Sequence, residues 1–213
     1  MRRPAIHCSN TFSTSFFALK LILASNSPRR RQLLAALGLS FDIRLLEVDE
    51  VFPAHLRRAE VAEFLAARKA AAYVSGLAPD ELVLTADTIV CLDDDVLNKP
   101  ADRAEAQAML GRLQGRSHEV YTGVCLRAGD GREVVFSDCT TVHFRPLRAA
   151  EIDHYIDTCQ PYDKAGSYGA QDWLGMAAID RLEGSYFNVM GLPTHRVWAE
   201  LAKLGALPAG GYA

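Results

Sequence analysis

The chain has 213 residues, 49% of them hydrophobic and 23% charged, which is enough to bury a core and fits one large domain or two fused lobes. The net charge of −3 supplies no general basic field, so we expect no binding to long nucleic acid and favour a small anionic ligand. No apolar run reaches the length of a membrane span, and no membrane partner is expected.

Residues 1–20 differ in composition from the rest of the chain. Arg2 and Arg3 precede a Ser/Thr-rich stretch without acidic residues, and Lys20 interrupts the apolar run that follows. We predict a disordered extension or an early start codon, with an organellar transit peptide as the alternative. The domain itself is expected to span 21–206, followed by a tail at 207–213.

The five cysteines are odd in number, widely spread and without a C-x-x-C pair. This pattern argues against both a disulfide framework and a zinc site, and it favours a reducing compartment. We therefore expect a cytoplasmic protein. The cysteines are Cys8, Cys91, Cys125, Cys139 and Cys159.

Apolar periodicity in the first half of the domain predicts strands that alternate with helices. One helix begins where Ser27 can cap free amide groups and Pro28 can occupy the first turn, and it ends at Gly38. In chain order the predicted elements are a buried strand at 21–24, this helix, a half-buried strand through 41–45, a helix through 61–72 and an apolar strand at 82–92.

The second half continues this alternation and adds two long strands. Asp102 and Glu105 form a capping box, and residues 129–131 (GDG) are typical of a tight hairpin. The predicted elements are a short segment ending at Lys99-Pro100, a helix after Asp102, strands at 117–128 and 132–145, a helix from about 149, a Gly-rich loop at 163–171, a strand pair around 183–185 and a last helix from Pro193. Together the two halves predict an α/β fold with a mixed sheet.

Several charged residues stand where the building of a core gives no reason for them. Arg29 and Arg30 lie at a predicted helix start, where free amides and the helix dipole favour an anion such as phosphate. Asp87 interrupts an apolar strand, where an ionised carboxylate is costly unless it meets a cation or hydrogen-bond donors. The alternatives are solvated surface arginines and an edge-strand acid that faces water.

Hydrolysis of a phosphoanhydride needs a water molecule in line and cations that neutralise the phosphate oxygens. Carboxylates that hold a divalent cation, together with fixed basic side chains, meet those needs. The candidates are Glu50, Asp87, Lys69 and Lys99, although Lys69 also fits an ordinary surface position on an amphipathic helix. The sequence contains no Gly-rich phosphate loop, no paired metalloprotease histidines and no serine-hydrolase elbow.

Seven motifs resemble, in order and spacing, the Maf family of nucleotide pyrophosphatases over about residues 20–205. They are 23–30 (LASNSPRR), 86–90 (ADTIV), 99–100 (KP), 113–118 (LQGRSH), 163–166 (DKAG), 184–186 (GSY) and 189–193 (VMGLP). The resemblance implies a Maf/Ham1-like (ITPase-like) α/β fold with an elongated mixed sheet and a cleft between two lobes. It also implies a homodimer.

The same resemblance implies roles for individual residues. Asp87 acts as general base or metal ligand with Glu50 as its acidic partner, a divalent metal (Mg²⁺ or Mn²⁺) is the cofactor, and Lys69 and Lys99 grip phosphates. The residues implied in binding the nucleoside triphosphate are Ser25, Arg29, Arg30, Thr88, Asp163, Lys164 and Gln171.

Within the family, Thr88 and Gln171 resemble the type that hydrolyses dTTP and UTP to the monophosphate and pyrophosphate, with modified pyrimidine triphosphates as further candidates. One alternative is a 7-methyl-GTP pyrophosphatase, which typically has Gln after the catalytic acid. The other is a non-catalytic nucleotide-binding regulator of septum formation. The chain departs from the family at Asn98, where Glu or Gly is more familiar, and at Asp172, where glycine is usual.

Overall fold

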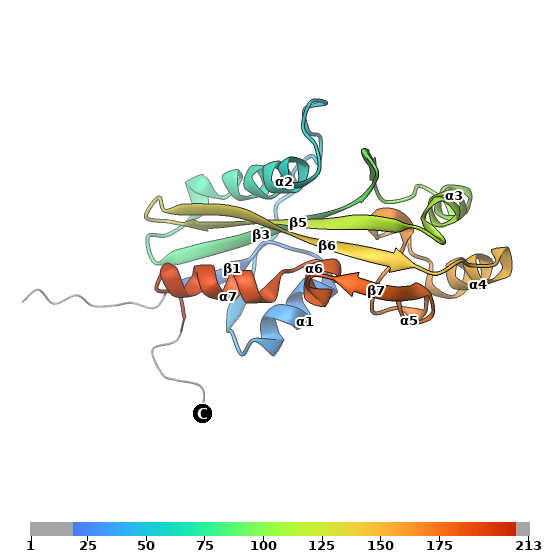
Figure 1. The fold of residues 1–213 in the computed structure, drawn as a ribbon. Coiled ribbons are helices and arrows are strands. Elements are labelled where there is room, and N and C mark those ends of the chain that lie inside the picture. Colours follow the sequence, from blue (N-terminus) through green and yellow to red (C-terminus); the bar gives the residue numbers. More distant parts are fainter. Residues whose placement is uncertain (1–18, 208–213) are drawn as a thin grey trace, which may run out of the picture.

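A seven-stranded sheet runs the length of the molecule in the computed structural model, which describes residues 19–207 (Figure 1). The strand order is β2-β1-β3-β5-β6-β7, and β4 pairs with β3. The strands are β1 (Lys20–Leu23), β2 (Phe41–Ile43), β3 (Glu81–Leu92), β4 (Asp95–Leu97), β5 (Ser117–Ala128), β6 (Glu133–Phe144) and β7 (Ile179–Glu183). The sheet is mixed, as predicted, because β1 is parallel to β2 and β3 and all other pairs are antiparallel.

Helices cover both faces of this sheet. Figure 1 shows α2 on one face, α1 and α7 on the other, and α3, α4 and α5 together at one end. The helices are α1 (Pro28–Ala36), α2 (Ala59–Ala71), α3 (Arg103–Leu113), α4 (Ala149–Cys159), α5 (Trp173–Ala178), α6 (Tyr186–Val189) and α7 (Thr194–Lys203), with 3₁₀ turns η1 (Val74–Gly76) and η2 (Ala165–Ser167). Within residues 19–207, no helix is long and apolar enough to cross a membrane.

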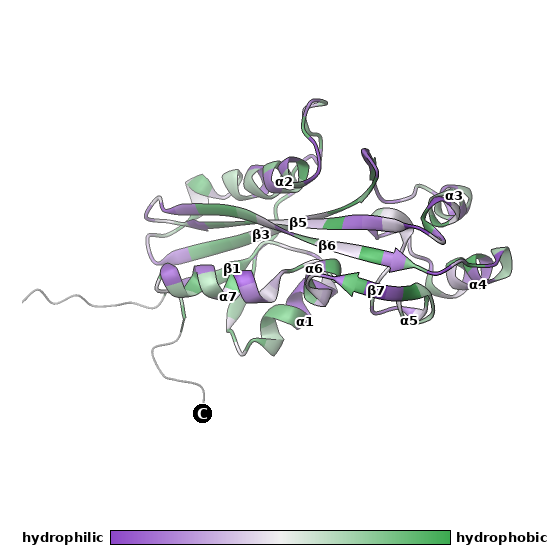
Figure 2. Ribbon diagram, in the orientation of Figure 1, coloured by the Kyte–Doolittle hydropathy of each residue, from purple (hydrophilic) through white to green (hydrophobic). Residues whose placement is uncertain are grey.

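Two apolar clusters divide the molecule into two lobes that share the long strands. One packs α1 and α7 against β1 and the first half of β3, around Leu34 and Leu84. The other packs α3, α4 and α5 against the far half of β3, around Leu110 and Ile156. Figure 2 shows the apolar stretches of β3 and β5 in the middle of the sheet. The predicted elongated sheet with two lobes is confirmed.

The outer edge of β3 is open at the junction of the two lobes. β1 pairs with residues 81–84 and β4 pairs with residues 90–92 of this strand. Between them, at 85–89, no described strand lies on that edge. Asp87 and Thr88 lie in this gap, where the backbone of β3 has no described strand partner on that side.

One predicted element near the C-terminus is wrong. The expected strand pair around 183–185 is a single strand, β7, followed directly by helix α6. Gly184 has a φ of +127°, which ends the strand, and the Ser185 side chain then accepts from the amide of Asn188 as an N-cap. Helix α5 was not expected from the sequence, and β2 ends at Ile43 rather than at Leu45. Most of the predicted extension at 1–20 and of the tail at 207–213 lies outside the described residues.

Candidate active site

A cavity of about 750 Å³ opens where the sheet edge is uncovered. Its lining comes from the loop before α1, the loop before α2, the middle of β3, and the segment between α4 and α5. All eleven residues singled out from the sequence line it: Ser25, Arg29, Arg30, Glu50, Lys69, Asp87, Thr88, Lys99, Asp163, Lys164 and Gln171. Residues up to 146 positions apart in sequence are thus brought to one place.

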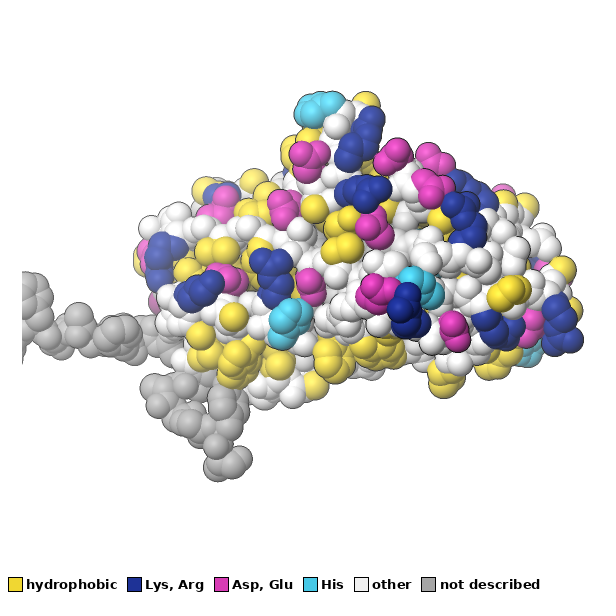
Figure 3. Space-filling model, in the orientation of Figure 1, with side chains coloured by type: hydrophobic (Ala, Val, Ile, Leu, Met, Phe, Trp, Pro, Cys, Tyr) yellow, Lys and Arg dark blue, Asp and Glu magenta, His cyan; other side chains and the backbone are white. Residues whose placement is uncertain are grey.

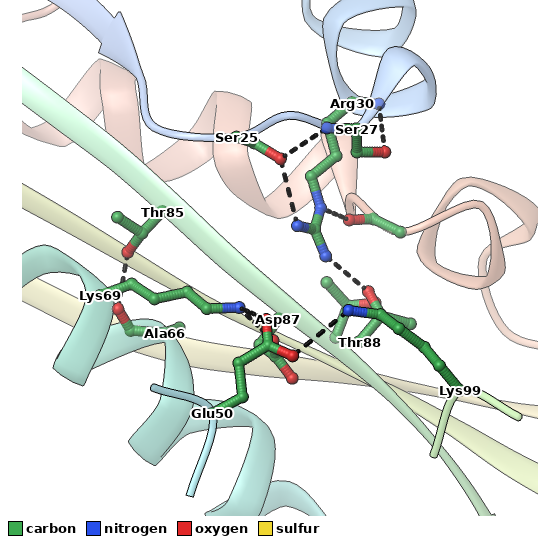
Figure 4. A network of polar contacts seen from close by, with 12 residues as sticks. Ser25, Ser27, Arg30, Glu50, Ala66, Lys69, Thr85, Asp87, Thr88 and Lys99 are labelled. Carbon is green, nitrogen blue, oxygen red and sulfur yellow. Dashed lines mark hydrogen bonds and ion pairs between the residues drawn. The ribbon is translucent and has the colours of Figure 1, made fainter. Parts of the chain in front are cut away.

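Asp87 is buried at the floor of this cavity. Only 8% of the residue is exposed, and one carboxylate oxygen lies 2.5 Å from Nζ of Lys69 (Figure 4). The interpretation of Asp87 as a water-facing edge acid is therefore wrong. The ion pair with the ammonium group of Lys69 offsets the free-energy cost of burying the carboxylate.

Close packing of α2 on the sheet brings Lys69 to this position. Gly123 on β5 is the register partner of Asp87, and a Cβ at Gly123 would lie 2.2 Å from the carbonyl of Ala62 on α2. The Thr85 hydroxyl also donates to the carbonyl of Ala66, at 2.7 Å. The backbone of α2 therefore rests directly on β5 and β3, and Lys69 is not an ordinary surface lysine.

Lys69 and Lys99 both contact Glu50. Nζ of Lys69 lies 2.7 Å from one carboxylate oxygen of Glu50, and Nζ of Lys99 lies 3.3 Å from the other. Partial burial raises the pKa of Glu50, but the two lysines outweigh this effect and hold the pKa below its ordinary value. Glu50 is therefore ionised at neutral pH, and Lys69 bridges it to Asp87.

The carboxylates of Glu50 and Asp87, which both contact Nζ of Lys69, lie close enough together to suit a divalent cation. Mg²⁺ and Mn²⁺ prefer oxygen ligands, and Mg²⁺ usually takes only one or two carboxylates together with water and substrate phosphates. Among the described residues, no three His, Cys, Asp or Glu side chains are grouped to hold a metal on their own. Glu50 and Asp87 therefore fit a metal that is bound jointly by protein and substrate.

Arg30 is fixed on the opposite wall by three hydrogen bonds. Its Nε donates to the carbonyl of Gly191 at 2.8 Å, Nη1 to Oγ of Ser25 at 3.3 Å, and Nη2 to Oγ1 of Thr88 at 3.0 Å (Figure 4). Burial lowers the pKa of the guanidinium, and the charge of Asp87 partly offsets this. No ion pair to Arg30 is found in residues 19–207, so its charge is free to meet an anion.

The start of α1 has the predicted helix-cap geometry. The Ser27 side chain accepts from the amide of Arg30 at 3.5 Å, and Pro28 occupies the first turn. Arg29 reaches across the cavity, where Nη1 lies 3.5 Å from a carboxylate oxygen of Asp163. The loop that was expected to bind phosphate therefore faces the segment between α4 and α5.

Asp172 organises that segment. Its carboxylate accepts from the Tyr155 hydroxyl at 3.1 Å and from Nε2 of Gln171 at 3.0 Å, and it lies 3.5 Å from Nζ of Lys164. Lys164 also pairs with Asp163, at 2.8 Å. Because Asp172 can only accept, it fixes the amide nitrogen of Gln171 toward itself. Sequence reasoning noted Asp172 only as a departure and missed Tyr155, which is fully buried and far away in sequence.

The chain is similar to proteins of one named family. The family model described as "Maf-like protein" matches residues 20–204. The dTTP/UTP pyrophosphatase of Phocaeicola vulgatus is 48% identical over 186 residues, which cover 87% of this chain and 96% of that protein. The dTTP/UTP pyrophosphatase of Porphyromonas gingivalis is 47% identical over 189 residues, covering 87% and 94%.

A crystal structure of a dITP/XTP pyrophosphatase from Mycobacterium abscessus aligns with 89% of this chain and 98% of its own, at 16% identity and a TM-score of 0.42. This likeness is too weak to add to the argument, so the assignment rests on the sequence relatives. The match of the family model and the identity to curated relatives both extend over most of the chain. The chain therefore belongs to the Maf family.

Proposed function

We propose that this protein is a nucleotide pyrophosphatase that hydrolyses dTTP and UTP to the monophosphate and pyrophosphate. The observation that carries the proposal is the buried Asp87, paired with Lys69 at the uncovered edge of β3 and facing a cavity with arginines on its far wall. The curated relatives that share 47–48% of the sequence are named dTTP/UTP pyrophosphatases, which gives the substrate.

In the proposed reaction, water attacks the α-phosphorus of the bound triphosphate. Asp87 accepts a proton from this water, the bond to the β-phosphate breaks, and pyrophosphate leaves. Lys69 and Lys99 move from the carboxylates to the phosphate oxygens, and Arg30 holds the triphosphate in line. A bound Mg²⁺ or Mn²⁺ supplies neutralisation of the phosphate charge, and Glu50 and Asp87 are the residues that would hold it.

The charge of the cavity supports a metal that arrives with the substrate. Five basic and four acidic side chains line it, so they nearly balance before any ligand binds. A triphosphate adds several negative charges that this lining alone does not offset. The basic side chains are Arg29, Arg30, Lys69, Lys99 and Lys164, and the acidic ones are Glu47, Glu50, Asp87 and Asp163.

We propose that the base is selected at the end of the cavity formed by the segment between α4 and α5, away from Asp87. Asp172 holds the amide nitrogen of Gln171, and Oε1 of Gln171 is buried without a hydrogen-bond partner in the described part of the chain. Once the side chain turns this buried oxygen into the cavity, it suits the N3–H donor of uracil and thymine and opposes cytosine, whose N3 is an acceptor. Arg29 and Thr88 also line this cavity, Thr88 on the phosphate-binding wall beside Arg30, and we propose that both contribute to base choice from there.

The test is pyrophosphate release from dTTP, UTP, CTP, dATP, GTP and 7-methyl-GTP, each with Mg²⁺, with Mn²⁺ and with chelator. We expect metal-dependent release concentrated on dTTP and UTP. Release from 7-methyl-GTP instead would move the protein to the sister type. Tight binding without release would favour the nucleotide-binding regulator.

We further propose that the protein acts as a homodimer in the cytoplasm, which is the assembly and compartment implied by the family resemblance and the cysteine pattern. On the face drawn in Figure 3, basic and acidic side chains are mixed, which agrees with a small anionic ligand rather than long nucleic acid. Light scattering during gel filtration would test the assembly, since a single species at the mass of one chain would contradict it.

A further inference from the structure

A closed ring of hydrogen bonds lies behind the wall of the cavity that carries Arg30. Arg30 Nη2 donates to Oγ1 of Thr88 at 3.0 Å, and the hydroxyls of Thr88 and Thr122 are 2.9 Å apart. Thr122 donates to the main-chain carbonyl of Asn188 at 3.0 Å. The same carbonyl also accepts from the main-chain amide of Gly191 at 2.9 Å. The carbonyl of Gly191 accepts from Nε of Arg30 at 2.8 Å and closes the ring.

The direction of each hydrogen bond in this ring follows from its chemistry. A hydroxyl has one proton, and the carbonyl of Asn188 can only accept, so the proton of Thr122 points to that carbonyl. Thr88 must then donate to Thr122, which leaves its oxygen free to accept from Arg30. The orientation of the Thr88 hydroxyl is therefore determined by Thr122, and Thr88 offers only a lone pair to a ligand.

The far side of the ring is anchored in the sheet. Thr122 and Asn188 are fully buried, and neither lines the cavity. Nδ2 of Asn188 donates to the carbonyl of Val120 at 2.9 Å and to Oγ1 of Thr140 at 3.0 Å. Because β5 and β6 hold Asn188, its carbonyl is a fixed acceptor for Thr122.

Thr122 and Asp87 act on opposite faces of the sheet. Thr88 and Thr122 are register partners, and so are Asp87 and Gly123. Successive side chains of a strand point to opposite faces, and Gly123 faces α2, so Asp87 shares the face of Lys69 whereas Thr122 shares the face of Arg30 and α6. A change at Thr122 reaches the phosphate-binding wall without touching the carboxylates.

We propose that Thr122 is a positioning residue for substrate binding, which acts through Thr88 on the guanidinium of Arg30. This inference rests on the proposed function, in which Arg30 holds the triphosphate. Without the Thr122 hydroxyl, the Thr88 proton can turn toward Arg30, and the guanidinium loses a fixed acceptor. Substrate binding weakens, while the groups that activate water stay in place.

The test is steady-state pyrophosphate release from dTTP by Thr122→Val, Thr122→Ala and Thr122→Ser. Val keeps the shape and removes the hydroxyl, Ala removes both, and Ser keeps the hydroxyl. We expect KM to rise about tenfold for Val and Ala, with kcat within about twofold, and Ser to stay close to wild type, because a hydrogen bond to a charged group is affected. Val124→Ala, on the same strand and face, controls for lost stability and should leave KM unchanged.

An unchanged KM in Thr122→Val would overturn the inference, as would a fall in kcat alone or a Ser variant as impaired as Val. If the wild-type protein releases no pyrophosphate from any nucleotide, the proposed function fails instead, so the two failures are distinguishable. The melting temperature of each variant, compared with that of Val124→Ala, shows whether Val or Ala is the better-folded probe, and either one alone decides the KM question.

Discussion

The two ends of the cavity use charge in opposite ways. At the carboxylate end, the ammonium of Lys69 lies between the carboxylates of Glu50 and Asp87. At the amide end, the carboxylate of Asp172 accepts from Tyr155 and Gln171 and lies near the ammonium of Lys164. At the carboxylate end, a phosphate or a metal can replace one partner of each ion pair. At the amide end, the side chains form a hydrogen-bonded network.

Only the outer pair of the carboxylate end is exposed. The Glu50 and Lys99 side chains are 47% and 55% exposed, whereas Lys69 and Asp87, at 18% and 11%, are as buried as Lys164 and Asp172, at 12% and 20%. Exposed ion pairs exchange partners at little cost, and buried hydrogen bonds hold one geometry. We propose that the carboxylate end serves the chemistry and that the amide end selects the base.

The largest effect is expected for Asp87→Asn. This change keeps the size of the side chain and removes both its charge and its basicity, so kcat for dTTP should fall by about 10²- to 10⁴-fold. Binding of dTTP, measured by calorimetry, should persist because Arg30 and the amide end are intact. Retained turnover would contradict the role of Asp87, and lost binding with normal kcat would make it a binding residue.

Gly123→Ala should damage the carboxylate end through α2. The new Cβ would lie 2.2 Å from the backbone of Ala62, so α2 must move and carry Lys69 with it. We expect a loss of about 1–3 kcal/mol in the free energy of unfolding, as in other overpacked cores, together with a lower kcat. Urea denaturation and turnover of the same sample measure both.

Gly111→Ala is the matched control for that experiment. Gly111 lies inside α3, and a Cβ there meets no atom within 4 Å. Alanine favours a helix interior over glycine by about 1 kcal/mol, so this variant should be as stable as wild type or more stable, with normal turnover. Equal losses in both variants would remove the close approach of α2 as the explanation.

Mild acid should lower the stability of the fold through His118, which contacts the wall of the cavity near the amide end. Nε2 of His118 lies 2.7 Å from the hydroxyl of Tyr168, which lines the cavity three residues before Gln171. Burial, with a smaller effect of His143, lowers the pKa of His118 from 6.5 to about 3, so below pH 6.5 the unfolded chain binds a proton that the folded chain does not. The stability from this group is complete above pH 6.5 and is lost as pH falls toward 3.

Between pH 6.5 and 5 the loss from His118 amounts to about 1–2 kcal/mol, because the slope rises from about half of 1.4 kcal/mol per pH unit at pH 6.5 to nearly the full value at pH 5. Urea denaturation at these two pH values should show it in the wild type, and His118→Gln should show a correspondingly smaller loss. Glu50 stays ionised over this range, since its pKa lies below the ordinary value. An equal pH dependence in the variant would mean that other groups cause it.

The smallest effect is expected for Asp172→Asn, as a change in selection. An asparagine can present either its nitrogen or its oxygen to Gln171. The amide of Gln171 can therefore turn and donate a hydrogen bond to N3 of cytosine. The ratio of kcat/KM for UTP to that for CTP should fall about tenfold, which is within the range of one lost hydrogen-bond preference. Asp157→Asn, which pairs with Arg103 on the exposed side of α4, is the control and should keep the ratio.

Local patterns in the sequence predicted most elements and pointed to the arginines at the start of α1 and to Asp87, whereas Ser25, Thr88, Asp163, Lys164 and Gln171 were implied only by the family resemblance. The helix start at Ser27-Pro28 and the acid within the apolar strand of Asp87 are visible because capping and alternation are local signals. The strand pair around 183–185 was predicted wrongly for the same reason. A local pattern does not show that Gly184 adopts a positive φ and that Ser185 caps a helix.

Contacts between distant segments were beyond such reasoning. Gly123 matters because α2 rests on it, and Thr122 matters because Thr88 and Asn188 converge on it from 34 and 66 residues away. Nothing in the neighbourhood of Thr122 in the sequence sets it apart from other strand threonines. The roles of Gly123 and Thr122 could therefore be inferred only from the register of β3 and β5 in the structure.

The division between the two ends is tested most directly by measuring pyrophosphate release from UTP and CTP by Asp87→Asn and Asp172→Asn in parallel. We predict that Asp87→Asn loses turnover of both nucleotides and keeps the preference of its residual activity, whereas Asp172→Asn keeps turnover of UTP and gains turnover of CTP. Loss of turnover in Asp172→Asn without a change in preference, or an altered preference in Asp87→Asn, would contradict the separation of chemistry from selection.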